Sequence, residues 1–256
     1  MNDAYKLLYN NLWLINKSRI AKLNPDYRLP QDIVAPVAIS KPVEISYLKP
    51  TKTTIAELPI VDNTPILKQK PADIILNWDA LVSTINNCKL CSLCDNRQNV
   101  VIERGNREAP WLFVGEAPNS DDDKECRPFA GQSGQLLDKM IGAMKLDVEH
   151  DVYICNIVKC SPPSNHNPKI NEIAMCKNYL LSQIELVKPK IIIALGRFAI
   201  QTLLDSNVAI EKLRGKVHKY NDIPLIATYD PTYLLRNPDA KKDAWDDLQL
   251  AMKTKG

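Results

Sequence analysis

The chain of 256 residues is long enough for one large domain, or for a smaller domain that carries an extension. Hydrophobic residues make up 45% of the chain, which supports a substantial core, and the formal net charge is only +3. This near balance of charges excludes a protein that binds nucleic acid through its net positive charge. Any DNA-binding surface must therefore be a local basic patch.

The cysteines and the hydropathy pattern indicate the compartment in which the protein works. Seven cysteines without a charged-then-apolar secretory leader favour metal-binding or free thiols over a disulfide framework. No apolar run approaches the roughly 20 residues that cross a bilayer. We therefore expect a monomer in a reducing cytoplasm, with no membrane partner.

The first 70 residues differ in composition from the rest. All eight glycines lie at or beyond Gly105, whereas prolines recur from Pro25 to Pro71. Leu and Trp at helical spacing predict one amphipathic helix over 4–23, followed by an extended Pro-rich linker over 24–70. We expect residues 1–70 to form a poorly ordered extension, with docking of an unknown partner protein as the alternative, and residues 71–256 to form the folded domain.

The folded part is expected to alternate between strands and helices. Apolar periodicity predicts a helix over 72–86, in which Ile74, Ile75, Trp78, Leu81, Val82 and Ile85 form the buried stripe. A strand at 112–114, a polar loop and a helix over 135–144 follow. Further strands are predicted at 152–158, 191–195 and 223–228, and further helices over 169–188, 197–204 and 240–252. This alternation predicts four parallel strands with helices on both faces of the sheet.

The loop after the strand at 112–114 carries an unusual set of polar side chains. It holds a carboxylate, an acidic cluster, a cation and an aromatic ring: Glu116, Asp121, Asp122, Asp123, Arg127 and Phe129. Open α/β sheets bind their ligands at the carboxyl ends of the strands, so this loop predicts a chemical site.

Four cysteines have the spacing of metal ligands. Cys88 and Cys91 form a CxxC pair, and Cys160 and Cys176 follow without a second close pair. Thiolates gathered from distant segments suit a four-cysteine iron–sulfur cluster, with zinc or redox thiols as alternatives. Cys94 competes with Cys91, because Cys91 and Cys94 also have CxxC spacing.

Several segments together resemble one known family, the thermophile-type (family 4) iron–sulfur uracil-DNA glycosylases. After the CxxC pair they read GEAPNSDDDKECRPFAGQSGQLLDKM, VYICNIVKCSPPSNHNP, KPKIIIALG and TYDPTYLLRNP, and the match covers about residues 72–252. The resemblance implies a three-layer α/β/α sandwich on a four-stranded parallel sheet. It also implies a structural 4Fe–4S cluster on Cys88, Cys91, Cys160 and Cys176.

The implied activity is that of a monofunctional DNA glycosylase. Such an enzyme removes uracil from single- or double-stranded DNA in base excision repair by flipping the base into a pocket. By resemblance, Glu116 would hold or deprotonate the attacking water, and Phe129 would stack on the uracil. Asn156 would hydrogen-bond the uracil edge, and Gly115 would let the backbone approach the base. The plainer alternatives are helix capping for Glu116, loop anchoring for Phe129 and backbone bonding for Asn156.

Three further residues are implied on the DNA side. Leu234 would fill the gap left by the flipped base, Arg236 would contact phosphate, and Asn165 matches a polar position of the family. An ion pair with Asp239 is the plainer alternative for Arg236.

The sequence departs from the family pattern at three positions. Asn119 and Cys126 stand where the family usually has glycine, and Asp230 replaces a histidine expected to donate a hydrogen bond to uracil O2. An ionised aspartate about 4 Å from the departing uracil anion would repel it by about 4 kcal/mol at an effective dielectric near 20. That energy corresponds to about three orders of magnitude in rate.

Three hypotheses keep Asp230 compatible with catalysis. In the first, Asp230 is held protonated beside Glu116 and donates a hydrogen bond to uracil. In the second, Asp230 faces the sugar and stabilises its cationic carbon. In the third, Asn119 supplies the missing hydrogen-bond donor. The alternative function is a DNA- or damage-binding protein with a weakened site. A third is a zinc- or thiol-redox protein that uses Cys91 and Cys94.

Overall fold

The structure is a computed structural model that describes residues 73–255. The expected helix over 4–23, the Pro-rich linker over 24–70 and the domain boundary after residue 70 all lie outside this range. Within it, none of the helices combines the length and the apolar sequence needed to cross a membrane.

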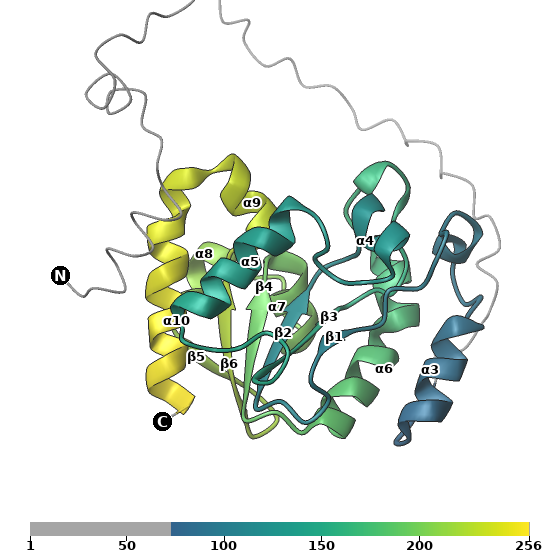
Figure 1. The fold of residues 1–256 in the computed structure, drawn as a ribbon, viewed down its shortest axis with the longest axis horizontal. Helices are drawn as coiled ribbons and strands as arrows, with labels where there is room; N and C mark the ends of the chain where they lie inside the picture. Colours follow the sequence, from purple (N-terminus) through teal and green to yellow (C-terminus); the bar gives the residue numbers. More distant parts are fainter. Residues whose placement is uncertain (1–72, 256) are drawn as a thin grey trace, which may run out of the picture. The chain divides into compact units, whose positions relative to one another are not determined.

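A six-stranded sheet forms the centre of the described part, in the order β1-β3-β2-β4-β6-β5 (Figure 1). Its four inner strands run parallel and are β3 (Val152–Asn156), β2 (Trp111–Gly115), β4 (Ile191–Leu195) and β6 (Ile223–Thr228). β3, β2 and β4 are buried along their whole length, as expected of parallel strands covered on both faces. The four predicted strands are therefore confirmed.

Two short antiparallel strands extend the sheet beyond the prediction. β1 (Arg104–Gly105) pairs with β3, and β5 (Val217–Tyr220) pairs with β6. β1 has only two residues, which is too short to show an alternation of apolar and polar residues. β5 has no buried residue. Neither strand therefore has the apolar pattern by which a strand is recognised in a sequence. The expected four-stranded sheet is thus the parallel centre of a six-stranded mixed sheet.

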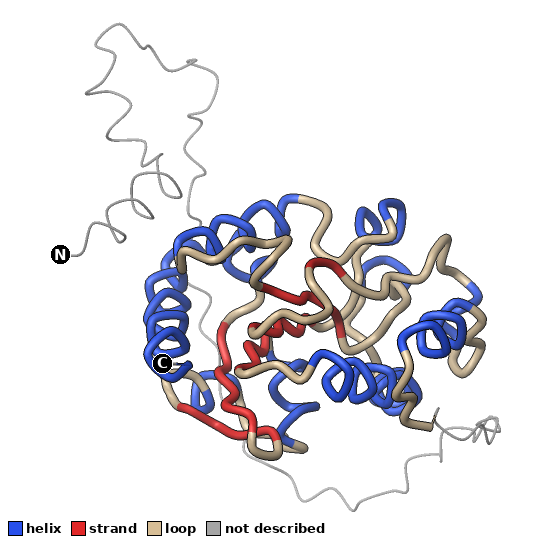
Figure 2. The backbone as a smooth tube through the Cα atoms, turned by 60° about the horizontal axis from the view of Figure 1, so that its bottom comes forward, coloured by secondary structure: helices blue, strands red, loops and turns tan. Residues whose placement is uncertain are grey.

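Helices cover both faces of the sheet (Figure 2). They are α3 (Trp78–Asn86), α4 (Ser120–Glu125), α5 (Gln132–Ala143), α6 (Ile170–Val187), α7 (Arg197–Leu204), α8 (Ile210–Leu213), α9 (Pro231–Arg236) and α10 (Lys241–Lys255). Short 3₁₀ turns lie at η1 (Ser92–Asp95), η2 (Pro163–Asn165) and η3 (Pro238–Ala240). α6 packs on β3, whereas α10 packs on β4 and β6.

Capping residues explain where the observed helices differ from the predicted ones. The helix expected over 72–86 begins only at Trp78, because the Asn77 side chain accepts the Ala80 N–H at 2.9 Å. Ile74 precedes the helix and is 44% exposed, so it does not belong to the buried stripe. α7 has the predicted bounds, and α6 ends one residue before its predicted end, at a left-handed Lys188.

Three short helices, α4, α8 and α9, were not predicted, and side chains cap the first turn of α4 and of α9. The Asn119 side chain accepts the N–H groups of Asp121 and Asp122, and the Asp122 carboxylate accepts the Asn119 N–H in return. Asp230 caps α9 by accepting the Thr232 N–H at 2.7 Å. Both segments therefore begin with residues whose side chains satisfy free N–H groups at a helix start.

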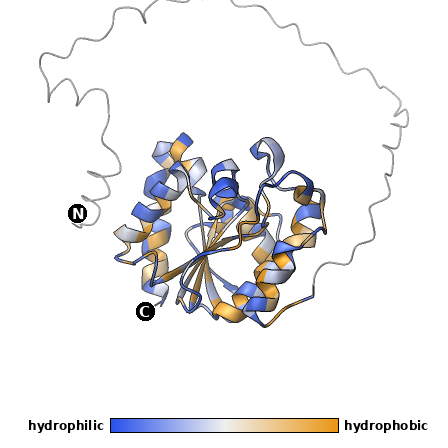
Figure 3. Ribbon diagram, turned by 45° about the vertical axis from the view of Figure 1, so that its right-hand side comes forward, coloured by the Kyte–Doolittle hydropathy of each residue, from blue (hydrophilic) through white to orange (hydrophobic). Residues whose placement is uncertain are grey.

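The core lies between the sheet and its helices. Figure 3 shows the apolar residues concentrated on the strands and on the helix faces turned toward them. The chain runs from β2 outward to β3 and then returns to β4 on the other side of β2. Because successive connections leave β2 and β4 in opposite directions, a crevice forms at their carboxyl ends, where open sheets bind ligands.

Candidate active site

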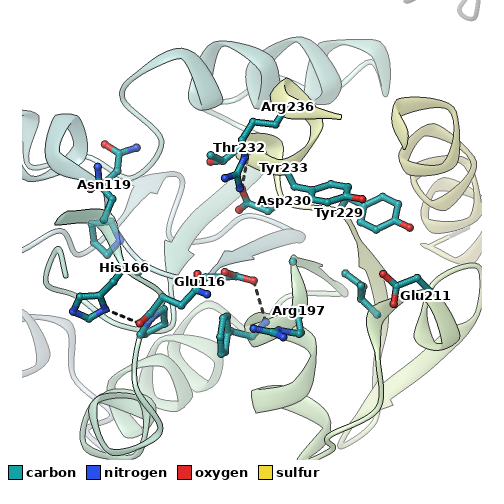
Figure 4. Close-up of a pocket in the computed structure, with 18 residues that line it drawn as sticks. Glu116, Asn119, His166, Arg197, Glu211, Tyr229, Asp230, Thr232, Tyr233 and Arg236 are labelled. Atoms are coloured by element: carbon teal, nitrogen blue, oxygen red, sulfur yellow. Dashed lines mark hydrogen bonds between the residues drawn. The ribbon is translucent and has the colours of Figure 1, made fainter. Parts of the chain in front are cut away.

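A cleft of about 520 Å³ opens at this edge of the sheet (Figure 4). Its walls come from the loop after β2, the start of α7, the segment 165–168 and the helix α9. The cleft brings together five predicted site residues that are distant in sequence: Glu116, Asn119, Asn165, Asp230 and Arg236.

Glu116 projects into this cleft from the end of β2 (Figure 4). Its Oε1 atom accepts the backbone N–H of Phe198 at 3.0 Å, in the first turn of α7. Free N–H groups at a helix start favour a negative charge, so the bond fixes one oxygen of the carboxylate. The side chain therefore caps a helix and still lines the cleft.

A glycine at the end of β4 lets two acids lie side by side. A Cβ atom at Gly196 would collide with Glu116 Oε1 and would lie 3.1 Å from the Cβ of Asp230. Gly196 also has φ +91°, in the region that favours glycine. The carboxyl groups of Glu116 and Asp230 are thus neighbours across the position where a side chain is missing.

Both acids have a raised pKa, and the charge of Asp230 contributes to the shift at Glu116. Burial raises the pKa of Glu116 to about 7, and the charge of Asp230 adds to this shift, whereas the Phe198 N–H opposes it. Burial also raises the pKa of Asp230, against the hydrogen bonds from Thr232. A carboxyl group with a pKa near 7 suits general acid–base chemistry at neutral pH, and two neighbouring acids favour a shared proton.

Phe129, Asn156 and Gly115 lie against one another in the interior, next to Glu116 in the chain. A Cβ atom at Gly115 would collide with Asn156 Oδ1 and would lie 2.6 Å from Cζ of the Phe129 ring. Phe129 is 6% exposed and Asn156 is 1% exposed. None of the three lines the open cleft, so the structure places them behind Glu116 and away from bulk water.

The Asn156 side chain has an unused hydrogen-bonding capacity. Neither its Oδ1 nor its Nδ2 has a hydrogen-bond partner among residues 73–255. An unsatisfied buried amide costs about 1–3 kcal/mol, so this position fits a ligand that offers both a donor and an acceptor. Phe129 beside it has φ +56°, a backbone conformation that is rare for an aromatic residue and is often found at functional sites.

Leu234 does not occupy the predicted wedge position. It is 1% exposed, because α9 packs against α5. Its neighbours Tyr233 and Leu235 are 38% and 40% exposed. The assignment of the wedge to Leu234 is therefore wrong in this structure, and α9 presents Tyr233 and Leu235 to solvent instead.

Much of the polar loop after β2 has a structural role. Asp122 and Asp123 are buried, and their carboxylates accept backbone N–H groups from segments on either side. Arg127 lies at the surface, where it pairs with Glu149 at 3.7 Å. None of these residues lines the cleft. Within this loop, only the first residues, from Glu116 to Asn119, and Phe129 belong to the site.

The four predicted cysteine ligands influence one another electrostatically. Burial raises the pKa of the Cys160 thiol to about 11, and the charges of Cys91 and Cys88 add to the shift. Burial raises the pKa of Cys176 to about 12, and Cys160 and Cys88 again add. In the described part of the chain, no three potential ligands come close enough to hold a single metal ion. The thiols are thus close enough to interact electrostatically, but they do not form a binding site for a single metal ion.

Arg97 faces this group of thiols. Its Nη1 donates to Cys160 Sγ at 2.9 Å, and its Nη2 donates to the Cys88 carbonyl at 3.0 Å. A guanidinium donor favours the thiolate, which is the form that binds metal. The competitor Cys94 donates to the Asp95 carboxylate; burial and this acid raise its pKa, and the charge of Arg97 opposes the shift.

The sequence analysis missed Gly196, Arg97 and Arg197, whose charge opposes the raised pKa of Glu116. A strand that ends in glycine and leads into a helix is the same pattern that drew attention to the loop after β2, so it could have identified Gly196 and Arg197. Arg97 follows no recognisable pattern, because its role depends on Cys160, which is distant in sequence.

The fold and the site together define the class of this protein. The family model described as the uracil DNA glycosylase superfamily matches residues 102–249, more than half of the chain. The chain therefore belongs to the uracil DNA glycosylase superfamily.

Individual relatives narrow the assignment. The chain is 43% identical over 171 residues to a type-4 uracil-DNA glycosylase of Thermotoga maritima, covering 65% of this chain and 88% of the relative. It is 36% identical over 179 residues to the type-4 enzyme of Archaeoglobus fulgidus, covering 67% and 89%. It is 38% identical over 181 residues to that of Saccharolobus solfataricus, covering 68% and 84%. Within the superfamily, the chain belongs to the type-4 uracil-DNA glycosylases.

Proposed function

We propose that this protein hydrolyses the N-glycosidic bond of uracil in DNA and leaves the sugar–phosphate backbone intact. The observation that carries the proposal is the buried, unpartnered amide of Asn156 beside Phe129. A flipped uracil that reached these residues would stack on the ring and satisfy an amide that both donates and accepts. The membership in the type-4 family supports the same activity.

Glu116 acts on the attacking water. The Phe198 N–H holds one carboxylate oxygen, and the other is free to accept a proton from a water molecule. The carbon–nitrogen bond breaks, and uracil leaves as an anion from a sugar carbon that becomes cationic. The water oxygen bonds to that carbon, and the water proton passes to Glu116. The negative charge of the acid pair stabilises the cationic carbon.

Asp230 is proposed to hold a proton shared with Glu116. One of its oxygens accepts the Thr232 N–H, and the side chain lines the cleft. In the protonated form it can donate a hydrogen bond to the leaving uracil, which replaces the donor that the family histidine supplies. Asn119 is the alternative donor, through its Nδ2 only, because its Oδ1 caps α4.

DNA contacts are proposed around the mouth of the cleft. Arg236 and Asn165 line it and would contact the phosphate backbone. Leu235, the exposed leucine of α9, takes over the role of filling the gap left by the flipped base.

Cys88, Cys91, Cys160 and Cys176 are proposed to hold a 4Fe–4S cluster. The cation of Arg97, which donates to Cys160 Sγ, suits a negatively charged cluster on these four cysteines, and a cluster accepts wider ligand spacing than a single ion. When bound, the cluster cross-links distant segments and takes no part in base release. Protein purified without oxygen should absorb near 400 nm, whereas colourless protein that contains zinc would contradict the cluster.

The activity is tested on oligonucleotides that contain one uracil, in U·G, U·A and single-stranded form, followed by alkaline cleavage. We expect cleavage at uracil by the parent, loss of about three orders of magnitude or more in Glu116→Gln, and no cleavage of a thymine control. A parent that leaves all three substrates intact would overturn the proposal.

A second candidate is a DNA-binding protein whose site is weakened by Asp230. The observation that favours it is the Asp230 carboxylate, whose hydrogen bond from Thr232 favours the ionised form. In that case the parent binds the oligonucleotide without releasing uracil, and Asp230→His restores release.

A further inference from the structure

The open cleft is larger than the recognition of uracil requires. Its volume of about 520 Å³ lies in the range that encloses a drug-sized ligand, which is bulkier than one pyrimidine base. Phe129 and Asn156, which are proposed to recognise uracil, do not line it. Figure 4 shows a further wall on the side of Asp230 away from Asn119, which the proposed reaction does not use. The residues of this wall are Tyr229, Tyr233 and Glu211.

The two tyrosines of this wall form a supported aromatic surface. Their ring centroids lie 4.9 Å apart and their planes differ by 26°, so the rings are stacked. Tyr229 is only 9% exposed, and Cζ of Arg214 lies 4.6 Å from the centroid of its ring. The buried Asp247 holds Arg214 at 2.9 Å. Tyr233 is 38% exposed and therefore rests on a fixed partner while it lines the cleft.

An exposed aromatic ring in a cleft that takes DNA suits a nucleobase. Every base has a flat face that stacks on an aromatic side chain, and such stacking contributes to the binding of single strands. The extrusion of a uridine removes it from the stack, so each neighbouring base loses its partner on one side. The ring of Tyr233 can replace that partner for one of the two neighbours.

Glu211 adds a hydrogen-bond acceptor to the same wall. It is exposed and lines the cleft, and its charge adds to the raised pKa of the buried Tyr229 hydroxyl. A carboxylate repels phosphate groups, so this position does not suit a contact with the DNA backbone. It accepts hydrogen bonds from amino groups, which cytosine and adenine carry where thymine and guanine have a keto oxygen. The wall therefore favours a base with an amino group.

We propose that this wall is a second base subsite: Tyr233 stacks on the nucleobase next to the flipped uridine, and Glu211 accepts a hydrogen bond from the amino group of that base. The inference rests on the proposed function and goes beyond it, because it gives the enzyme a preference for sequence context. Uracil beside cytosine or adenine is bound more tightly than uracil beside thymine or guanine, whereas base release itself still depends on Glu116.

The subsite is tested by the binding of single-stranded oligonucleotides to the full chain, followed by fluorescence anisotropy. Each oligonucleotide carries one deoxyuridine that is fluorinated on the sugar, so that its glycosidic bond resists cleavage. Both neighbours are cytosine, adenine, thymine, guanine or an abasic residue. Tyr233→Leu removes the ring, Tyr233→Phe keeps it, and Glu211→Gln removes the charge. Glu125→Gln, at an exposed residue outside the cleft, is the matched control.

We expect the parent to bind the oligonucleotide with cytosine neighbours about tenfold more tightly than the one with abasic neighbours. It should prefer cytosine to thymine, and adenine to guanine, by about fivefold. Tyr233→Leu should lose the preference for a base over an abasic neighbour, and Tyr233→Phe should keep it. Glu211→Gln should lose the preference for amino groups, because an amide both donates and accepts. Glu125→Gln should match the parent throughout.

The inference is overturned if Tyr233→Leu weakens binding equally for all neighbours, because the ring then only supports the fold. It is also overturned if Glu211→Gln keeps the preference for amino groups, or if the parent binds all five oligonucleotides equally. If Tyr233→Leu does not fold, the parent and Glu211→Gln still decide. Release of uracil is measured separately on cleavable oligonucleotides. A parent that binds with the expected preferences but releases no uracil contradicts the proposed function and supports the subsite.

Discussion

Glu116 and Asp230 form a pair of acids in a site where the family pattern has one acid and one histidine. Gly196 allows the two side chains to approach each other closely. Burial raises the pKa of each carboxyl group above its ordinary value. The pair therefore changes its charge near neutral pH, which makes the chemistry of the site dependent on pH.

The first prediction concerns this pH dependence. Because Glu116 must be ionised to accept a proton from water, the rate should rise as the pH passes about 7 in the parent. Asp230→Asn removes the second acid of the pair, whose charge when ionised contributes to the raised pKa of Glu116, and keeps a residue suited to the start of α9. The pKa of Glu116 should therefore fall. Single-turnover rates from about pH 5 to 9 should then rise at a lower pH than in the parent.

The control for this experiment is Asp222→Asn, at an exposed residue outside the cleft. It should leave the profile unchanged. An Asp230→Asn profile that coincides with that of the parent would show that the two carboxyl groups do not influence each other.

The second prediction concerns stability. The pKa of Glu116 is raised from 4.5 to about 7, so the folded state binds the proton more tightly than the unfolded state does. The resulting stabilisation is present at low pH and is lost as the pH rises from about 4.5 through 7. Glu116→Gln should therefore raise the free energy of unfolding by about 1–3 kcal/mol at pH 8 and by much less near pH 4.

Chemical denaturation at the two pH values measures this difference directly. The same variant should lose uracil release, so the prediction links a gain in stability to a loss of activity. A Glu116→Gln protein that is less stable than the parent at pH 8 would contradict it.

At the scale of elements, α9 decides which side chains reach the DNA. Its first residue follows the Asp230 cap, and this register turns Leu234 toward α5 and Leu235 toward solvent. The short helix therefore sets both the position of an acid of the site and the identity of the exposed leucine.

The third prediction compares these two leucines. Leu234→Ala removes a buried side chain and should lower the free energy of unfolding by about 2–5 kcal/mol. Leu235→Ala should change stability by less than about 0.5 kcal/mol. It should reduce uracil release from double-stranded DNA more than from single-stranded DNA, because only the duplex leaves a gap to fill. Denaturation and the oligonucleotide assay test both variants, and a reversal of these effects would restore the wedge to Leu234.

The sequence predicted the elements with strong apolar patterns and missed those that rest on capping. The strands at 191–195 and 223–228 have their predicted bounds because uninterrupted apolar runs mark buried parallel strands. Asn119 with Asp122, and Asp230 with Pro231, are helix-start patterns that could have predicted α4 and α9.

Other features of the site depend on the three-dimensional structure. The sequence could place Asn156 at the end of a strand, but only the packed structure shows that its amide has no partner. Lys159 looked like an ordinary lysine after an apolar strand, and its burial could not be read from its neighbours in the chain. Both the unpartnered amide of Asn156 and the burial of Lys159 depend on contacts between segments that are distant in sequence.

At the scale of the whole molecule, the described residues contain all the strands and helices that build the site. The fourth prediction is that residues 73–256 alone should fold and release uracil at a rate within about threefold of that of the full chain. The reason is that the parallel sheet, its covering helices and the cleft lie within 73–255.

Circular dichroism and the oligonucleotide assay on the shortened protein test this prediction. A shortened protein that is insoluble or inactive would show that residues 1–72 contribute to the fold or to the site. Retained activity would leave the interpretation of this segment as a docking arm for a partner protein open to a direct binding assay.

The short antiparallel strands at the margins of the sheet affect how the protein behaves in concentrated solution. β1 and β5 pair with the outermost parallel strands, and β5 carries the exposed Lys219. Without them, the free N–H and C=O groups of β3 and β6 would be open to strands of other molecules. Substitutions that detach β5 should therefore produce precipitation on storage or at high expression, while molecules that remain dissolved keep an intact catalytic centre.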